Sequence, residues 1–204
     1  MPQRRVILLD LDGVLVDSRA AVERAWRGWA SRHDLDPGAV LAIAHGRRTQ
    51  DTIREAAPHL DAELEALVLE RDETAESDGL HALPGAAELL GSLAPGTWAV
   101  VTSGTRELAT ARLKAAGLPI PAVLVTAEDV VNGKPDPEGY LRAAGSLGAE
   151  PEECVVIEDA PAGIAAALAA GMMAIGVTST HARHELRGAH LIVERVADVR
   201  PALT

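Results

Sequence analysis

The 204-residue chain is long enough for one sizeable hydrophobic core, or for a core with a small insertion, and its 48% hydrophobic and 24% charged residues are typical of a folded globular protein. A formal net charge of −11 argues against nucleic acids and anionic membrane surfaces as partners, and the scarcity of aromatic residues argues against a base-stacking surface. The one cysteine, Cys154, lies in an apolar run and is expected to be buried. With a single cysteine no disulfide can form within the chain, which fits a reducing compartment.

Signals for membranes and export are missing from the sequence. The segment before the first predicted strand lacks the apolar region of a signal peptide, and no apolar run reaches the roughly 20 residues needed to cross a bilayer. We therefore expect a cytoplasmic protein without membrane partners. The sequence leaves the oligomeric state open, and a monomer is compatible with it.

The first predicted element is a strand over residues 6–9. Its consecutive apolar residues are too few for a helix and are typical of a strand buried on both faces of a parallel sheet. Asp10 and Asp12 follow at the end where ligands of such sheets bind, and a divalent cation would relieve the repulsion between them. Gly13 permits a sharp turn or the close approach of a ligand. Taken alone, these residues would equally suit an ordinary acidic turn.

The rest of the chain divides into an all-helical stretch and an alternating one. Between residues 18 and 80 the apolar spacing predicts helices only, with Ser18 as the N-cap of the first. From Leu83 onward strands alternate with helices, which predicts right-handed βαβ units and a parallel sheet. The expected helices are 18–32, 37–44, 49–57, 62–76, 86–93, 106–116, 137–147 and 160–170, and the expected strands are 98–101, 122–125, 154–157, 173–177 and 191–193.

Polar residues follow two of these strands. Thr102, Ser103 and Gly104 come directly before a helix, where hydroxyl and backbone N–H groups bind phosphate oxygens well, although a Ser or Thr there is also a common helix cap. The spacing does not decide which hydroxyl points inward. Lys134 lies in the loop 133–137, whose two prolines stiffen the backbone around the charge. In isolation such a lysine would equally be a surface charge.

Glu158 and Asp159 stand at the end of the predicted strand 154–157, directly before a helix. Acidic residues at that position would also be stabilised by the helix dipole alone. With this pair, the chain contains four segments that resemble, in the same order, the four motifs of the haloacid dehalogenase-like hydrolase superfamily. The four segments are 6–18, 102–106, 133–137 and 155–163.

The resemblance implies an α/β fold, namely a Rossmann-like parallel sheet with helices on both faces, plus a small all-helical cap domain. The catalytic core would comprise residues 1–16 and 82–204, and the cap would be the insertion 17–81. The chain looks most like the branch of glycerol-3-phosphatases and 2-deoxyglucose-6-phosphate or sugar phosphatases. The resemblance therefore implies a Mg²⁺-dependent phosphoric monoester hydrolase that acts on a small phosphorylated metabolite, a sugar or polyol phosphate.

Site residues are also implied by the resemblance. Asp10 would attack phosphorus and form an aspartyl-phosphate, Asp12 would act as general acid and then general base, and Lys134 would stabilise charge on the phosphoryl group. Hard oxygen ligands suit Mg²⁺. The implied phosphate-binding residues are Thr102, Ser103, Gly104 and Lys134, and the implied metal ligands are Asp10, the backbone carbonyl of Asp12, Glu158 and Asp159.

The loop between the second and third cap helices contains His45, Arg47 and Arg48. Beside Gly46, these basic residues would also suit a solvated turn. The resemblance implies that this loop lies over the active site, where family caps contact the non-reacting end of the substrate and cap closure excludes water. All three are candidate specificity residues, and the similarity to the string His-Gly-x-Arg-Thr of related phosphatases favours Arg48.

Three alternatives remain open. A phosphomutase of the β-phosphoglucomutase type shares the four motifs, but such mutases carry a His at the position of Val22. A phosphoglycolate-type phosphatase would differ only in its substrate. A catalytically idle binding protein on the same fold would not need the full set of acidic residues and Lys134. The sequence does not rank glycerol phosphate, deoxyhexose phosphates, hexitol phosphates and phosphoglycolate as substrates.

Overall fold

The computed structural model describes residues 5–75 and 78–199. Its main element is a six-stranded parallel sheet, whose strands are β1 (Val6–Leu9), β4 (Trp98–Val101), β5 (Leu124–Val125), β6 (Cys154–Glu158), β7 (Met173–Val177) and β8 (Leu191–Val193). The strand order is β5-β4-β1-β6-β7-β8. This is the order of a Rossmann-like sheet, as the sequence predicts. Strand β5 is shorter than the predicted range 122–125, because only Leu124 and Val125 pair with β4.

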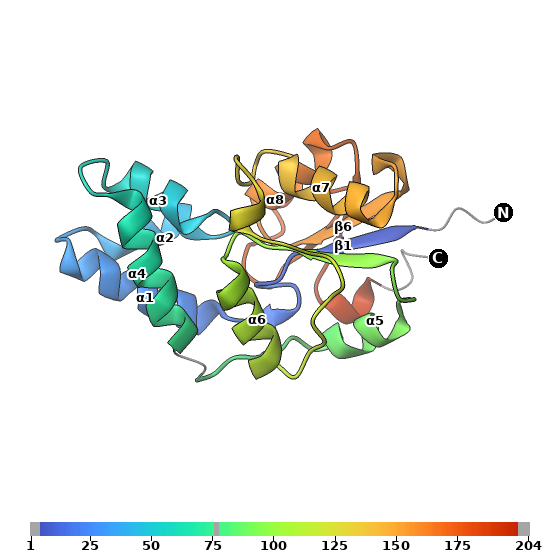
Figure 1. Ribbon diagram of the computed structural model, residues 1–204, viewed down its shortest axis with the longest axis horizontal. Coiled ribbons are helices and arrows are strands. Elements are labelled where there is room, and N and C mark those ends of the chain that lie inside the picture. Colours follow the sequence, from blue (N-terminus) through green and yellow to red (C-terminus); the bar gives the residue numbers. More distant parts are fainter. Residues whose placement is uncertain (1–4, 76–77, 200–204) are drawn as a thin grey trace.

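Helices cover both faces of the sheet. They are α5 (Ala86–Ser92), α6 (Arg106–Ala115), α7 (Glu138–Leu147) and α8 (Pro161–Ala169), with short 3-10 helices η1 (Ala127–Asp129), η2 (Pro151–Glu153) and η3 (Val196–Asp198). Side chains of β1 alternate between the faces: Ile7 and Leu9 pack toward α5 and α6, whereas Val6 and Leu8 pack toward α7 and α8. Figure 1 shows the two helix pairs on opposite sides of the sheet. Burial on both faces explains why β1 is apolar throughout.

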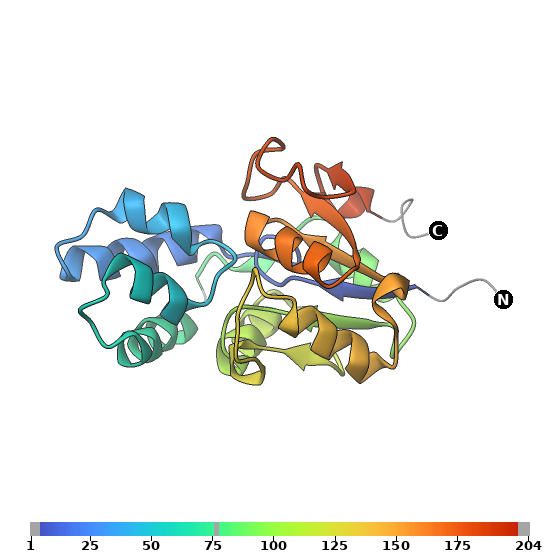
Figure 2. The ribbon, with the colours of Figure 1, turned by 90° about the horizontal axis from the view of Figure 1, so that it is seen from above.

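The stretch between β1 and α5 forms a group of four helices with its own hydrophobic core. The helices are α1 (Arg19–Arg32), α2 (Pro37–Ala44), α3 (Thr49–Ala56) and α4 (Ala62–Ala75). Trp26 and Trp29 lie in this core with their rings edge to face, 5.5 Å between centroids. Figure 2 shows the four helices as a separate group beside the sheet. The predicted end of the last helix, residue 76, lies outside the described residues.

Two short strands at the junction between the helical group and the sheet are not indicated by the sequence. Strands β2 (Val16–Asp17) and β3 (His81–Ala82) pair antiparallel and join the outgoing chain to the returning chain. Two residues are too few to show a periodic pattern. Ser18 occupies the N-cap position of α1, but its hydroxyl does not cap the helix; it donates to Asp12 Oδ1 instead, at 2.6 Å.

Cys154 is buried, as its apolar surroundings predict, with 1% of its surface exposed. Burial raises the pKa of its thiol to about 11, which makes it a poor nucleophile. Within residues 5–75 and 78–199, no helix combines the length and apolar character that a membrane span requires.

Candidate active site

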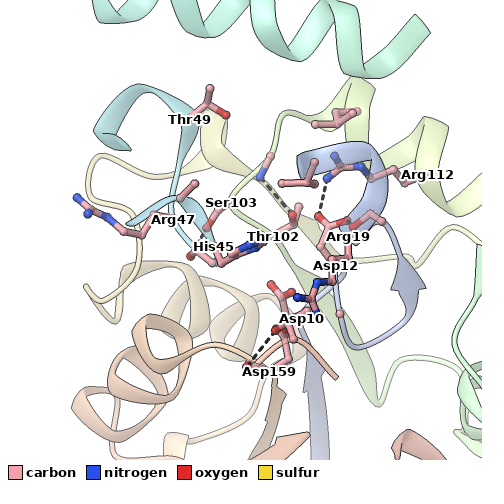
Figure 3. A pocket seen from close by; sticks show the side chains of 18 of the residues that line it. Asp10, Asp12, Arg19, His45, Arg47, Thr49, Thr102, Ser103, Arg112 and Asp159 are labelled. Atoms are coloured by element: carbon pink, nitrogen blue, oxygen red, sulfur yellow. Dashed lines mark hydrogen bonds and ion pairs between the residues drawn. The ribbon is translucent and has the colours of Figure 1, made fainter. Parts of the chain in front are cut away.

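A pocket lies at the carboxyl edge of the sheet, between the sheet and the four-helix group (Figure 3). The strand order reverses where β1 meets β4 on one side and β6 on the other, which is the point where ligands of open α/β sheets bind. Asp10 follows β1, and Thr102 follows β4. His45 and Glu73 contribute to the wall from the helical group. The pocket therefore combines residues of both parts of the chain.

Asp10 and Lys134 form a buried ion pair in this region. Lys134 Nζ donates to Asp10 Oδ1 at 2.5 Å, to Glu158 Oε1 at 2.6 Å and to the Val101 carbonyl at 3.2 Å, so all three of its protons have acceptors. Burial opposes the charged form of the lysine, but Asp10 and Glu158 outweigh it and raise the pKa of Lys134 well above its usual value. The ammonium group is therefore held charged against the Asp10 carboxylate, 124 residues away in sequence.

The Glu158 carboxylate is fully occupied by hydrogen bonds. Its Oε1 accepts from Lys134 and from the Tyr140 hydroxyl at 2.8 Å, and its Oε2 accepts two backbone N–H groups of the next two residues at 3.0 and 3.1 Å. Four bonds use about the full acceptor capacity of a carboxylate. A Cβ atom at Gly163 would lie 1.6 Å from Oε1, so only glycine fits there. Glu158 thus anchors the lysine as well as adding negative charge.

Asp10, Glu158 and Asp159 form an acidic cluster whose carboxylate oxygens lie within 4.8 Å of one another. Burial raises the pKa of Asp10 to about 8. Lys134 lowers this pKa, and repulsion from Glu158 raises it further. Burial, with repulsion from Glu158 and Asp10, raises the pKa of Asp159 well above its usual value. The Thr180 hydroxyl donates to Asp159 and opposes this shift. The raised pKa values show that one ammonium does not offset three buried carboxyl groups; a divalent cation would stabilise their charged forms, and hard oxygen donors suit such a cation.

The predicted phosphate-binding residues Thr102, Ser103 and Gly104 all line the pocket. The Gly104 N–H donates to Thr102 Oγ1 at 3.2 Å, and Ser103 Oγ donates to the Gly46 carbonyl at 3.0 Å. The Ser103 hydroxyl thus ties this loop to the helical group. Thr105, not these residues, caps α6, since its side chain accepts from the Leu108 N–H. The helix-cap alternative for Thr102 and Ser103 is therefore wrong.

Asp12 has a partner that the sequence motifs do not contain. Arg112 Nη1 donates to Asp12 Oδ2 at 2.7 Å, and Arg112 Nη2 donates to Glu73 Oε2, also at 2.7 Å. Burial, partly offset by Arg112, raises the pKa of Glu73 to about 7. Arg112 lies on α6 and Glu73 on α4, so this buried chain of charges crosses from the sheet domain to the helical group. The apolar spacing in the sequence predicts α4 and α6 individually, but it does not predict that the two helices contact each other.

The three basic candidates of the helical group have different surroundings. The His45 ring lies among the pocket side chains in Figure 3 and packs against His181, with 5.9 Å between ring centroids. Burial, with a smaller contribution from His181, lowers the pKa of His45, which favours the neutral ring. Arg47 also lines the pocket, but its guanidinium pairs with Glu55 at 2.7 Å. His181 lies in the loop after β7 and is half-buried at this junction.

Arg48 is not among the described residues that line the pocket. Its guanidinium pairs twice with Asp51, at 2.7 and 3.1 Å, and donates to the carbonyls of Val130 and Val131 at 3.4 and 3.0 Å. A Cβ atom at Gly133 would overlap the Arg48 side chain. The preference for Arg48 as the substrate contact stays a prediction, and the contacts that the structure gives its guanidinium are to Asp51 and to the loop at residues 130–131. Its buried side chain holds the helical group to the loop that precedes Lys134.

Arg48→Ala is expected to reduce stability without changing the substrate ranking. The change removes the charge-assisted hydrogen bonds of a buried guanidinium to the half-buried Asp51 and to two backbone carbonyls, which we expect to cost about 2 kcal/mol of unfolding free energy. The measurements are denaturant unfolding and kcat/KM over several phosphate esters. Arg54→Ala, which removes exposed ion pairs with Asp51 and Glu63 outside the pocket, is the matched control. A changed substrate ranking with unchanged stability in Arg48→Ala would contradict this expectation and support the substrate-contact role.

Comparisons with known proteins agree over nearly the whole chain. The family model of haloacid dehalogenase-like hydrolases matches residues 4–171. Hexitol phosphatase A of Escherichia coli is 47% identical over 197 residues, covering 94% of this chain and 91% of that protein. 2-Deoxyglucose-6-phosphate phosphatase 1 of Saccharomyces cerevisiae is 40% identical over 199 residues, covering 85% and 80%. The crystal structure of a hydrolase from Pseudomonas syringae matches with a TM-score of 0.87 and 29% identity, covering 98% and 97%.

Proposed function

Because the chain belongs to the haloacid dehalogenase-like hydrolase family, we propose that it is a Mg²⁺-dependent phosphatase that hydrolyses small sugar or polyol phosphate monoesters through an aspartyl-phosphate. The chain is a phosphoric monoester hydrolase, and its relatives are named for hexitol and 2-deoxyglucose 6-phosphate. The observation that carries the mechanism is the buried Asp10–Lys134 pair at the switch point of the sheet, beside the acidic pair Glu158 and Asp159.

The proposed reaction has two steps. In the first, an Asp10 oxygen bonds to phosphorus while the bond to the leaving oxygen breaks, and Asp12 gives its proton to that oxygen. In the second, water attacks phosphorus, Asp12 takes a proton from the water, and the bond between Asp10 and phosphorus breaks. Lys134 stabilises negative charge on the transferred group in both steps. Thr102, Ser103 and the Gly104 N–H are proposed to bind the other phosphoryl oxygens.

The proposed metal ligands are Asp10, Asp159 and the backbone carbonyl of Asp12, with Glu158 in the same cluster. Because the hydrogen bonds of Glu158 already occupy its oxygens, we propose that it does not bind the cation directly and instead holds Lys134 beside the other ligands. The cation would supply positive charge that screens the phosphate and orients it for in-line attack. The excess of buried carboxylates over ammonium groups supports this assignment.

We propose that residues 17–81 act as an inserted cap over a core of residues 1–16 and 82–204. The separate hydrophobic core of the four helices and their contribution to the pocket wall support this division. Val22 also lines the pocket. An apolar side chain cannot exchange a proton with a sugar hydroxyl, and this supports hydrolysis over the mutase alternative.

The first experiment is phosphate release from a panel of esters, with Mg²⁺ and with chelator. The panel contains glycerol phosphate, a hexitol phosphate, 2-deoxyglucose 6-phosphate and phosphoglycolate. We expect polyol or sugar phosphates to be preferred, and chelation to slow release by at least about 100-fold because the cation contributes several kcal/mol to the transition state. Equal rates in chelator would contradict the metal assignment, and no release from any ester would contradict the function.

A further inference from the structure

Both oxygens of the Asp12 carboxylate accept hydrogen bonds from side chains. One donor, Ser18, is the last residue of the segment 6–18, and the other, Arg112, lies outside the four motif segments. Ser18 Oγ donates to Oδ1 at 2.6 Å, and Arg112 Nη1 donates to Oδ2 at 2.7 Å. Two donors on two oxygens fix the plane of the carboxylate. Resting on the proposed function of Asp12, we propose that Arg112 is a positioning residue that orients this carboxylate for proton transfer, and that Glu73 of the helical group holds Arg112 in place.

Arg112 is placed in a way that suits such a role. Only 5% of its surface is exposed, although an arginine is rarely buried unless its charge is paired. Its two terminal nitrogens bind two different acids, Asp12 and Glu73, each at 2.7 Å. The guanidinium group is rigid and planar, so fixing one nitrogen fixes the direction of the other. In Figure 3 the Arg112 side chain reaches toward Asp12 from the opposite side to Asp10.

Glu73 makes the arrangement depend on the helical group. Its side chain is 8% exposed and lies on α4, which packs against α6, the helix that carries Arg112. A movement of the helical group away from the sheet would therefore draw Glu73 off Arg112. The guanidinium would then lose one of its two fixed contacts, and the orientation of Asp12 would be less restricted. Proton transfer by Asp12 would therefore be efficient only while the helical group lies against the sheet.

The chemistry makes this role measurable. In the proposed mechanism Asp12 gives a proton to the leaving oxygen. A polyol needs this proton because its alkoxide is a poor leaving group, whereas p-nitrophenolate is a stable anion that leaves without a proton. Misplacing the Asp12 carboxylate should therefore slow an alkyl phosphate much more than p-nitrophenyl phosphate. A loss of phosphate binding or of folding would slow both substrates together.

The test compares glycerol phosphate and p-nitrophenyl phosphate in Arg112→Met, Arg112→Lys and Glu73→Gln. In Arg112→Met we expect kcat to fall about 100-fold on glycerol phosphate, the size of a general-acid contribution, and only a few-fold on p-nitrophenyl phosphate. Arg112→Lys should recover part of the loss. Lys114→Met on α6 and Asp72→Asn on α4, both exposed, are the matched controls. An equal loss on both substrates would overturn the proposal.

A double variant identifies the residue through which Arg112 acts. If Arg112 works only by orienting Asp12, then adding Arg112→Met to Asp12→Asn should cause no further loss on glycerol phosphate. Additive losses would overturn the proposal. If Arg112→Met does not fold, Glu73→Gln gives the same comparison, with a smaller preferential loss on glycerol phosphate expected and an equal loss on both substrates counting against it. Failure of wild type to hydrolyse any ester would instead contradict the proposed function.

Discussion

Asp10→Asn is expected to lower kcat by at least about four orders of magnitude, the size of effect seen when a nucleophile is removed from other covalent enzymes. The amide has the shape of the carboxylate but cannot attack phosphorus. Because burial raises the pKa of Asp10 to about 8, its buried charge is itself unfavourable, and the neutral amide should leave the melting temperature near that of wild type. The measurements are phosphate release and thermal unfolding.

The control for this variant is Asp17→Asn, seven positions further along the chain and outside the described residues that line the pocket. It should retain wild-type turnover. Rapid-quench mass spectrometry should detect a phosphorylated wild-type chain during turnover and none in Asp10→Asn. Wild-type turnover in Asp10→Asn would contradict the nucleophile assignment, because no other carboxylate in the cluster is placed against Lys134 without being committed to backbone hydrogen bonds.

Lys134→Met is expected to damage stability and activity together. Removing the ammonium leaves Asp10 and Glu158 buried without their counter-charge, which we expect to cost about 3 to 5 kcal/mol of unfolding free energy. We expect kcat to fall about 100- to 1000-fold, because a fixed positive charge next to the transferred group is lost. The measurements are denaturant unfolding and phosphate release, each with Mg²⁺ and with chelator.

The metal dependence of Lys134→Met gives a second, independent result. A bound cation supplies counter-charge to the same carboxylates and stabilises only the folded chain, so Mg²⁺ should recover more stability in this variant than in wild type. Lys114→Met, an exposed lysine on α6, controls for the loss of a positive charge in general. Stability equal to wild type in chelator would show that the buried ion pairs do not hold this site together.

The placement of several candidate site residues at one edge of the sheet could be predicted from local patterns. Asp10, Thr102 and Glu158 each stand at the end of an apolar run that is recognisable as a buried strand. Parallel strands joined by helices bring their carboxyl ends to one edge of the sheet, so residues far apart in sequence meet there. Lys134 arrives by the same rule, from the loop after β5 and η1. Chain order and strand ends predicted that these residues meet, whereas their proposed roles came from the resemblance to the family motifs.

The surroundings of Asp12 could not be predicted in this way. Arg112 lies 100 residues from Asp12 and 39 from Glu73, and its position in α6 marks it only as one polar residue on a helix. Which side chains of the helical group face the pocket was equally undetermined, as the contrast between His45 and Arg48 shows. These contacts depend on how two separate hydrophobic cores are set against each other.

By itself, the sequence determined the Rossmann-like sheet, the helical insertion and the acidic residues at the strand ends, because these follow from short-range periodicity and from the connectivity of parallel strands. Only the tertiary structure decided that Glu158 is committed to hydrogen bonds, that Arg48 holds a loop and that Arg112 joins Asp12 to Glu73. The physical reason is that ion pairs across a junction depend on the rotation and placement of whole helices, which no local pattern specifies.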